Sequence, residues 1–338
     1  MGANRFARWL VAGVAATIIT ACSPSGAQRS IPAAGTPVTS SAAKGATKHL
    51  YVIVTTKRKF IAEYPIANGI PQAKPDRMVL GLIAPNAIAV DSAGNLYVLD
   101  LKTLKEFAPG ASGFAKPTRE IDLKSFLNIN TLAVDARGYL YVGQKSRVYV
   151  YAPGAHGHAT PIAKFKPVGY PAGFTFDAGD NFYVQGNTQT YDPYRAFQTH
   201  VTVYSAAPKL QRIRTFCTPV FTDFGISYGV ALDGRGALFT TYTYFISSYP
   251  YGEIHVYPQR AKMCPRNPST IIRTVNPSLH EPVYLAVDDP YLYVGDVFYG
   301  DGGVVFTLKT TGQQQTPLGT LSVAGNRPHN ILGIAVGP

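Results

Sequence analysis

The residues best suited to metal-dependent chemistry are two histidines and one glutamate near the C-terminal end of the chain. His280 and Glu281 begin the segment "HEPVY" (280–284), and His329 begins "HNILG" (329–333). Two imidazoles and one carboxylate form a known ligand set of catalytic divalent metals. No short-range ligand motif accompanies them, and two histidines in polar turns can also serve solubility alone. The sequence therefore leaves two hypotheses for these residues: a metal site, or polar turn residues that serve solubility alone.

No other segment has the context of a catalytic or ion-binding motif. The segment "GISYG" (225–229) matches Gly-x-Ser-x-Gly, but it leads into an innermost strand of the repeat, whereas a nucleophile elbow joins a strand to a helix. Asp296 and Asp301 in "GDVFYGDGG" lack the spacing of a calcium loop. Several further aspartates each end an apolar segment just before a short turn. An aspartate at the first turn position accepts backbone N–H groups two residues on. We therefore expect a structural role for Asp91, Asp135, Asp177, Asp233 and Asp288.

A repeated segment indicates which elements position these side chains. The tripeptides "LYV", "FYV" and "LFT" recur at about 40 to 55 residues, a period typical of propeller blades. Their aromatic residues are Tyr51, Tyr97, Tyr141, Tyr183, Phe239 and Tyr293. An apolar segment such as "AIAVD" precedes each copy from the second onward, and an aromatic segment such as "RVYVYAP" follows. A Pro/Gly-rich turn and a last strand complete each period, so every period holds four strands.

The two ends of the repeat predict how the fold closes. The first strand is "HLYVIV" (49–54), the second strand of a blade, and the last is "LGIAV" (332–336), an innermost strand. If the last strand joins the first blade, the ring closes and an exposed sheet edge disappears. The sequence therefore predicts one all-β domain over residues 48–338. It is a six-bladed β-propeller of four-stranded antiparallel blades, its ring closed by the C-terminal strand.

Two segments carry a resemblance to a known family. "AIAVDSAGNLYV" (87–98) and "VYVYAPGAHGHATP" (148–161) resemble NHL-type six-bladed propellers of exported bacterial lipoproteins. The resemblance covers roughly residues 48–338 and implies the architecture alone, because such propellers include enzymes, binding modules and scaffolds. Gluconolactonase-type propellers hold a metal with Glu, Asn and Asp at the channel, and propeller amidating lyases use three histidines. This chain offers only part of either set.

The loops of a propeller place a second group of candidate residues on one face, which we call the top face. It carries the loops that lead into the innermost strands and the turns between the second and third strands of each blade. The first set of loops should form a channel mouth beside His280, Glu281 and His329. Its members are Asn86, Asn128, Asn130, Tyr170, Tyr228 and Asn330.

The turns between the second and third strands divide the top face into two halves. In the first three blades they are short and basic, with Lys57, Arg58, Lys59, Lys102, Lys145 and Arg147. In the last three they are longer and aromatic, with Tyr191, Tyr194, Tyr244, Phe245, Tyr249, Tyr251, Phe298 and Tyr299. Clustered exposed aromatics indicate a binding surface, and tyrosine both packs and hydrogen-bonds. The alternative is that the rings pack on each other and the cations are merely solvated.

The N-terminal residues predict export and a lipid anchor. Arg5 and Arg8 precede an apolar run too short to span a bilayer, and the segment ends in "ITAC". This tetrapeptide resembles the bacterial lipobox, which implies that residues 1–22 are a signal peptide and that Cys22 is lipidated. The composition of residues 23–47 predicts a flexible Ser/Ala/Pro/Gly tether. The resemblance to lipoproteins further implies the outer membrane, because Ser23 stands at their sorting position and is not Asp. An ordinary signal peptide with an accidental cysteine is the alternative.

The net charge bears on the class of binding partner, and the cysteine content bears on a disulfide. The net charge of +12 favours anionic surfaces, but an exported protein rarely meets nucleic acid, so we expect none as a partner. Cys217 and Cys264 can form a disulfide in an oxidising compartment. The repeat places them at opposite ends of neighbouring blades, so a bridge requires the loop at 258–268 to climb the outer edge.

Two functions follow from these patterns. The first is a monomeric, lipid-anchored propeller of the cell envelope that binds or scaffolds an envelope polysaccharide or a protein partner through its top face. It would need no cofactor. The second is a metal-dependent lyase or hydrolase, gluconolactonase-like or related, that acts at the channel mouth with His280, Glu281 and His329. The sequence favours the first, because no catalytic motif accompanies the candidate ligands.

Overall fold

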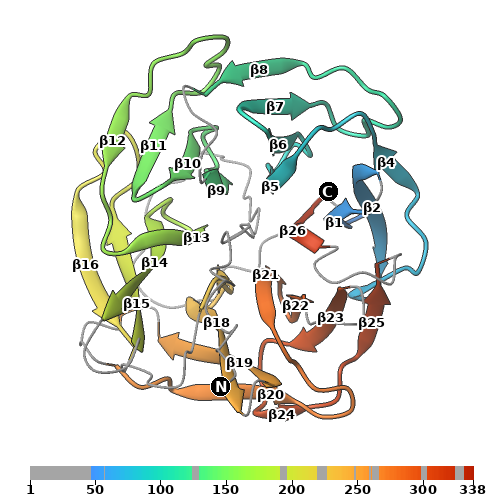
Figure 1. Cartoon of the computed structure of the whole chain (residues 1–338), viewed down its shortest axis with the longest axis vertical. Helices are drawn as coiled ribbons and strands as arrows, with labels where there is room; N and C mark the ends of the chain where they lie inside the picture. The colour runs from blue at the N-terminus through green and yellow to red at the C-terminus, as the bar shows by residue number, and fades with distance from the viewer. Residues whose placement is uncertain are drawn as a thin grey trace, which may run out of the picture.

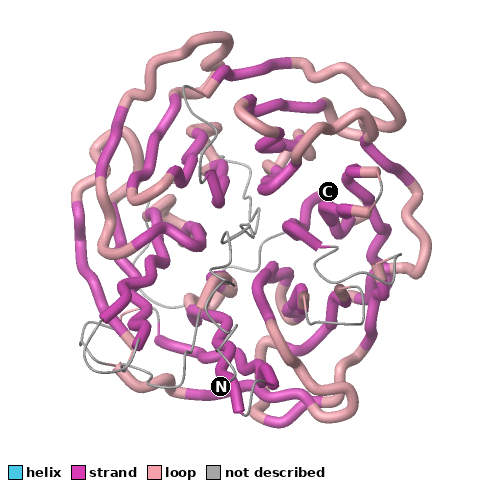
Figure 2. Tube along the Cα trace, viewed as in Figure 1, coloured by secondary structure: helices cyan, strands magenta, loops and turns pink. Residues whose placement is uncertain are grey.

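The computed structural model describes residues 47–56, 58–123, 129–190, 196–218, 227–246, 249–258, 260, 266–297, 303–323 and 331–338. The side chains of residues 129, 130, 189, 190, 196 and 197 lie outside this description. The described residues form strands and connecting loops without a helix (Figure 2). Among them, no helix is long and apolar enough to cross a membrane.

Six antiparallel sheets are arranged as blades around a central axis (Figure 1). Each blade has four main strands, which are named below in order from the innermost to the outermost. Blade 1 contains β26 (Ile331–Gly337), β1 (His49–Thr55), β2 (Lys59–Ala67) and β4 (Arg77–Val79). Blade 2 contains β5 (Pro85–Val90), β6 (Leu96–Asp100), β7 (Thr103–Phe107) and β8 (Arg119–Asp122). Blade 3 contains β9 (Ile129–Val134), β10 (Leu140–Gln144), β11 (Arg147–Tyr151) and β12 (Ala163–Phe165).

The second half of the chain repeats the same order, and the second and third strands of blades 4 and 5 are 9 or 10 residues long. Blade 4 contains β13 (Tyr170–Phe176), β14 (Phe182–Thr190), β15 (Ala196–Tyr204) and β16 (Arg212–Cys217). Blade 5 contains β17 (Val230–Leu232), β18 (Ala237–Ile246), β19 (Tyr249–Pro258) and β20 (Thr270–Thr274). Blade 6 contains β21 (Pro282–Asp288), β22 (Tyr291–Asp296), β23 (Val304–Lys309) and β25 (Gly319–Ser322). Two short strands, β3 (Ile70–Pro71) and β24 (Gln314–Gln315), lie in connections.

The ring closes as the sequence predicts. The C-terminal strand β26 pairs antiparallel with β1, so that the red last strand and the blue first strand meet in blade 1 (Figure 1). The Tyr51 hydroxyl also donates to the carbonyl of Pro338 at 2.8 Å. Closure removes the two sheet edges that an open array of blades would expose. The six-bladed, all-β prediction is confirmed.

The hydrophobic core lies where neighbouring blades face each other. Alternating strand residues point to opposite faces of a sheet, so each blade offers apolar side chains to both neighbours. One buried cluster, for example, joins Tyr51 and Ile53 of blade 1 to Ile88 and Val98 of blade 2. The axis is therefore surrounded by packed sheets, and the loops at the two ends of the blades are free to vary.

Four of the five repeated aspartates have the structural role that the sequence predicts: Asp91, Asp135, Asp177 and Asp233 accept backbone N–H groups of their turns. Asp288 departs from this prediction, because its partner is the Lys48 ammonium. Asp91 Oδ1 accepts the N–H groups of Ala93 and Asn95, each at 2.9 Å. Its Oδ2 accepts the Tyr97 hydroxyl at 3.1 Å, and burial together with this carboxylate raises the pKa of Tyr97. The same arrangement recurs at Asp135 and Asp177. These carboxylates fix the turn between the first two strands to the aromatic repeat residue, so they are committed to the fold.

Candidate functional site

The top face is defined by carboxylates at the ends of second strands. Asp100 at the end of β6 accepts the N–H groups of Ile83 and Ala84 at 2.9 and 2.6 Å. Asp296 at the end of β22 accepts those of His280 and Glu281 at 2.7 and 3.1 Å. Both acids are buried. They tie the loops that lead into the innermost strands to the turns between second and third strands, so both loop sets lie on one face.

The basic half of the top face is present on blades 1 to 3. Its described members are all exposed: Arg58, Lys59, Lys102, Lys145 and Arg147. Lys57 lies outside the described residues. In the described turns of this face, the carboxylates Asp100 and Asp296 are buried, and Lys105 pairs with Asp100 at 2.8 Å. Every exposed charge in these turns is therefore positive, which makes this half attractive to anions.

The aromatic half is represented by the long β18–β19 hairpin of blade 5. Tyr244 and Tyr251 face each other across the hairpin, with stacked rings 5.7 Å apart and 20° between their planes. Tyr242 stacks on Tyr244 at 5.9 Å. Near the tip, Tyr249 is 62% exposed and Tyr251 42%, and Phe245 is also exposed. The rings therefore pack on each other and are still partly exposed, and binding at this surface stays a prediction.

Contacts at the base of the hairpin hold it in place. Glu253 accepts Arg273 Nε at 2.7 Å and contacts His255 Nε2 at 3.0 Å. Burial raises the pKa of Glu253, but the bonds from His255 and Arg273 outweigh burial, and the net shift is downward. Gly252 lies so close to Pro282 of blade 6 that a Cβ there would be 2.3 Å from its Cδ. The hairpin is therefore a fixed projection above blade 5.

Four predicted aromatic residues and several predicted channel residues cannot be placed. Outside the described residues lie Tyr191, Tyr194, Phe298, Tyr299, Asn128, Asn330 and His329. Asn130 belongs to β9, with its side chain outside the description. Asn86 is half-buried in β5, and Tyr170 at the start of β13 is 66% exposed. Tyr170 is therefore an exposed aromatic residue of blade 4.

The channel mouth contains one carboxyl with unusual acid–base character. Burial, with a further contribution from the Asp296 charge, raises the pKa of Glu281 to about 7. Burial and the nearby Glu281 charge raise the pKa of Tyr228 to about 12. His280 is half-buried beside them. Since Asp296 is engaged by two backbone N–H groups, the described candidate ligands at this mouth are His280 and Glu281, and a third ligand depends on His329.

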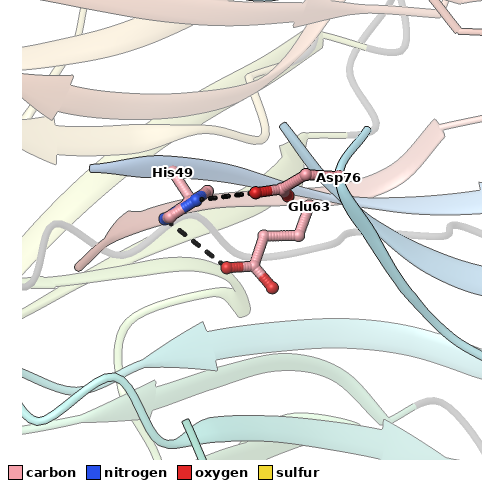
Figure 3. A group of neighbouring side chains, drawn as sticks. All are labelled: His49, Glu63 and Asp76. Carbon is pink, nitrogen blue, oxygen red and sulfur yellow. Dashed lines mark hydrogen bonds and ion pairs between the residues drawn. The ribbon is translucent and has the colours of Figure 1, made fainter. Parts of the chain in front are cut away.

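A cluster with metal-ligand chemistry lies elsewhere, in blade 1 (Figure 3). His49 begins β1, Glu63 is on β2, and Asp76 precedes β4. His49 Nδ1 is 3.5 Å from Glu63 Oε1, and its Nε2 is 3.3 Å from Asp76 Oδ2. Sequence reasoning missed this group because its members come from three separate segments. The sequence signal that could have found the cluster is that each of the three residues lies in, or directly before, a strand of the first blade.

An arginine already supplies the cation that this cluster needs. Arg77 Nη2 lies 2.6 Å from Glu63 Oε1 and 3.1 Å from His49 Nε2, between the atoms that would bind a metal. Blade 2 has the same pair at the same register position, Glu106 with Arg119. The Glu63–Arg77 ion pair is therefore a feature of the repeat. We interpret the cluster as a structural ion-pair network.

Cys217 at the end of β16 is disulfide-bonded. Cys264 and Cys22 lie outside the described residues. The N–H of Arg266, two residues after Cys264, donates to the carbonyl of Cys217 at 2.7 Å. The connection of blade 5 therefore reaches the outer edge of blade 4, which is the path that a Cys217–Cys264 bridge requires.

Comparison with known proteins supports the fold. No protein-family model and no curated protein matches the chain. A protein of unknown function from Bacteroides caccae superposes with a TM-score of 0.53 and 12% identity, over 86% of this chain and 99% of that one. The WD40 domain of Toxoplasma gondii coronin gives 0.48 and 11%, over 82% and 69%. The WD40 propeller of Doa1 gives 0.48 and 10%, over 83% and 86%.

At these identities the likeness shows the fold alone, and the two WD40 values are too low to carry an argument. The first match shows that a solved protein has the same overall architecture over nearly its whole length. The resemblance to NHL-type lipoprotein propellers stays a prediction from the sequence. Function must be argued from the residues of this chain.

Proposed function

We propose that the protein is a binding or scaffold module of the cell envelope. Its top face binds an acidic polysaccharide, or an acidic region of a protein partner, without catalysis. The observation that carries this proposal is the division of that face. Every exposed charge in the described turns is positive, and an exposed aromatic hairpin stands on blade 5.

Each half would recognise a different part of the same polymer. Cations on the turns of blades 1 to 3 would bind carboxylates or phosphates, and the rings of Tyr249 and Tyr251 would pack on the apolar faces of sugar rings. Tyrosine suits this role because it is rigid and offers both an apolar surface and a hydroxyl. The N-terminal lipid anchor at Cys22 and the tether at 23–47, both predicted from the sequence, would hold the module at the outer membrane as a monomer.

The test uses the protein without its signal peptide on a polygalacturonate column, with a neutral glucan column as the reference. The double variant Tyr249→Ala, Tyr251→Ala should bind about ten-fold more weakly, since each lost ring contact contributes about 0.5–1.5 kcal/mol. Phe114→Ala is the matched control, because Phe114 is 80% exposed in the connection between β7 and β8. Unchanged retention of the tyrosine variant, with an intact circular dichroism spectrum, would reject the site.

A second function, a metal-dependent lyase or hydrolase at the channel mouth, is favoured by one observation. The backbone N–H groups of His280 and Glu281 are both bonded to Asp296, which holds these two candidate ligands next to each other at the channel mouth. His280, Glu281 and His329 would hold the divalent metal, which would polarise the substrate. The metal content of protein purified without chelator decides between the two functions. About one ion per chain that is lost in His329→Ala supports the enzyme, and none supports the binding module.

A further inference from the structure

The outer strands of four blades are covered by the next blade's connection between third and fourth strands. In blade 1, the N–H of Gly113 donates to Met78 and that of Leu80 to Gly113, each at 2.7 Å. In blade 2, Gly157 makes the same two bonds with Glu120 and Asp122, each at 2.8 Å. Connections also cover blade 4, through Arg266 and Cys217, and blade 5, where β24 runs parallel to β20. Each connection acts as a short added strand on the neighbouring blade.

Blade 6 is covered in a different way. Its outer strand β25 lies against β3 of the blade 1 connection. The contact is so close that a Cβ on Gly319 would be 2.7 Å from Ile70 Cγ2. A side chain therefore occupies the space beside β25, although no backbone bond of the described residues joins the two.

Blade 3 is the exception. Its outer strand β12 is the last strand of its sheet, and Lys164 and Lys166 occupy the places of Glu120 and Asp122 in blade 2. Within the described part of the chain, no backbone group bonds to the outward carbonyl of Lys164 or to the N–H of Lys166. The outer strand of blade 3 therefore lacks, among the described residues, the covering segment that lies on the outer strands of blades 1 and 2.

The sequence explains the open edge. The connections that cover blades 1 and 2 are residues 108–118 and 152–162. Both place a glycine with positive φ at the bonded position, Gly113 at 65° and Gly157 at 58°. The connection that would cover blade 3 is shorter, residues 205–211, and holds no glycine. It turns back at once, with the N–H of Ser205 bonded to the carbonyl of Gln211 at 2.8 Å.

The charge on this edge selects what can pair with it. Lys164 and Lys166 are both exposed, and Lys164 Nζ lies 5.1 Å from the centre of the Tyr149 ring. Lysines on a short edge strand keep two copies of the same edge apart, and this protection is a sufficient structural reason for them. The same two cations favour a strand that carries carboxylates. The edge therefore repels a second copy of itself and attracts an acidic segment.

We propose that the outer edge of β12 receives an extended acidic segment of a partner protein by strand addition. Main-chain bonds to Lys164 and Lys166 would supply affinity, and the two lysine side chains would select carboxylates at alternate positions. The added segment would run parallel to β12, as the covering segments of blades 1, 2 and 5 run beside their strands. This interaction uses the outer rim of blade 3 and is independent of ligand binding on the top face.

The first test measures hydrogen exchange at single amides of the free protein. The Lys166 amide should exchange at least about 100-fold faster than the Asp122 and Leu80 amides, which are bonded at the same place in blades 2 and 1. Equal protection of all three amides would show that the edge is already covered and would overturn the proposal.

The second test adds a blocked peptide of alternating glutamate and valine residues. It should bind and slow exchange at Lys166, while the same peptide with lysine in place of glutamate should bind at least about ten-fold more weakly. Lys166→Pro removes the outward N–H, and the residue before it is already extended, so binding should fall at least about ten-fold. A variant in which residues 152–162 replace 205–211 should cover the edge itself and also lose binding. Wild-type protein that binds neither peptide, or variants that bind like wild type, would reject the proposal.

Discussion

At the scale of single residues, several aspartates of this protein accept hydrogen bonds from backbone N–H groups. Asp91, Asp135 and Asp177 fix the turns at one end of the blades, and Asp100 and Asp296 fix the loops at the other. Removal of a buried carboxylate that accepts two or three hydrogen bonds lowers the free energy of unfolding, because the donor groups stay buried without an acceptor. These acids therefore stabilise the fold, and the exposed charges in the described turns of the top face are positive.

Asp100→Ala tests this role. The side chain of Asp100 is fully buried and accepts the N–H groups of Ile83 and Ala84 and the Lys105 ammonium. Its removal should lower the free energy of unfolding by about 3 kcal/mol, measured by urea denaturation. Asp122→Ala, at an exposed position of the same blade, should cost less than about 1 kcal/mol. A loss of similar size in both variants would contradict the argument.

Glu281 makes stability depend on pH. Its pKa is about 7 in the folded protein, above the ordinary value of 4.5, so the folded state holds the proton more tightly than the unfolded chain. The free energy of unfolding should therefore fall as the pH rises from about 4.5 to about 7. Glu281→Gln should remove this fall, so its stability relative to wild type should be higher at about pH 8 than at about pH 4.

The measurement is thermal or urea denaturation at a series of pH values. Glu120→Gln, at an exposed position of β8, is the matched control and should keep the wild-type pH profile. A wild-type profile in Glu281→Gln would mean that Glu281 is not the group responsible.

At the scale of elements, the connections between third and fourth strands do more than return the chain. Each of four connections extends the sheet of the preceding blade, so neighbouring blades are joined by backbone bonds as well as by apolar contacts. Sheet edges are liable to pair with other chains, and these connections cover them. The connection of blade 5 is the one that brings the chain near Cys264 to Cys217.

Mass mapping of peptides without reduction should find Cys217 linked to Cys264. Cys264→Ser should then release one free thiol and lower stability by about 2–4 kcal/mol, as for loss of other native disulfides. The chain has three cysteines, so the other possible pairing can be recognised in the same experiment. A bridge from Cys217 to Cys22 would contradict both this pairing and lipidation at Cys22.

At the scale of the whole molecule, the strand order that the blades share places the described turns between second and third strands on one face. The basic turns come from blades 1 to 3, and the aromatic hairpin belongs to blade 5 (Figure 1). A cationic surface raises the local concentration of anions, and dissolved salt screens this effect. The proposed polymer binding should therefore depend strongly on ionic strength.

Affinity for polygalacturonate should fall about ten-fold or more between about 50 and 200 mM salt, measured by calorimetry or column retention. The double variant Lys145→Glu, Arg147→Glu should bind more weakly at low salt and show a shallower salt dependence. Its circular dichroism spectrum should stay unchanged, since both side chains are exposed. Affinity that is independent of salt would exclude the basic half from the site.

The sequence by itself determined the blade count, the strand order and the closing strand. These features depend on local patterns, namely the aromatic tripeptides, the turn aspartates and the alternation of apolar residues. It also identified the exposed cations and the tyrosines of blade 5, because turn residues stay at the surface of a propeller. Because the strand and turn patterns recur in each repeat, the interpretation of one repeat predicts the structure of the others.

Only the tertiary structure decided which distant groups meet. His49, Glu63, Asp76 and Arg77 come together because three strands pair in one register, and the same pairing in blade 2 shows that their ion pair is structural. The raised pKa of Glu281 depends on burial beside Asp296, which no local pattern encodes. The open edge of β12 is visible only against the covered edges of other blades, because coverage depends on contacts between blades.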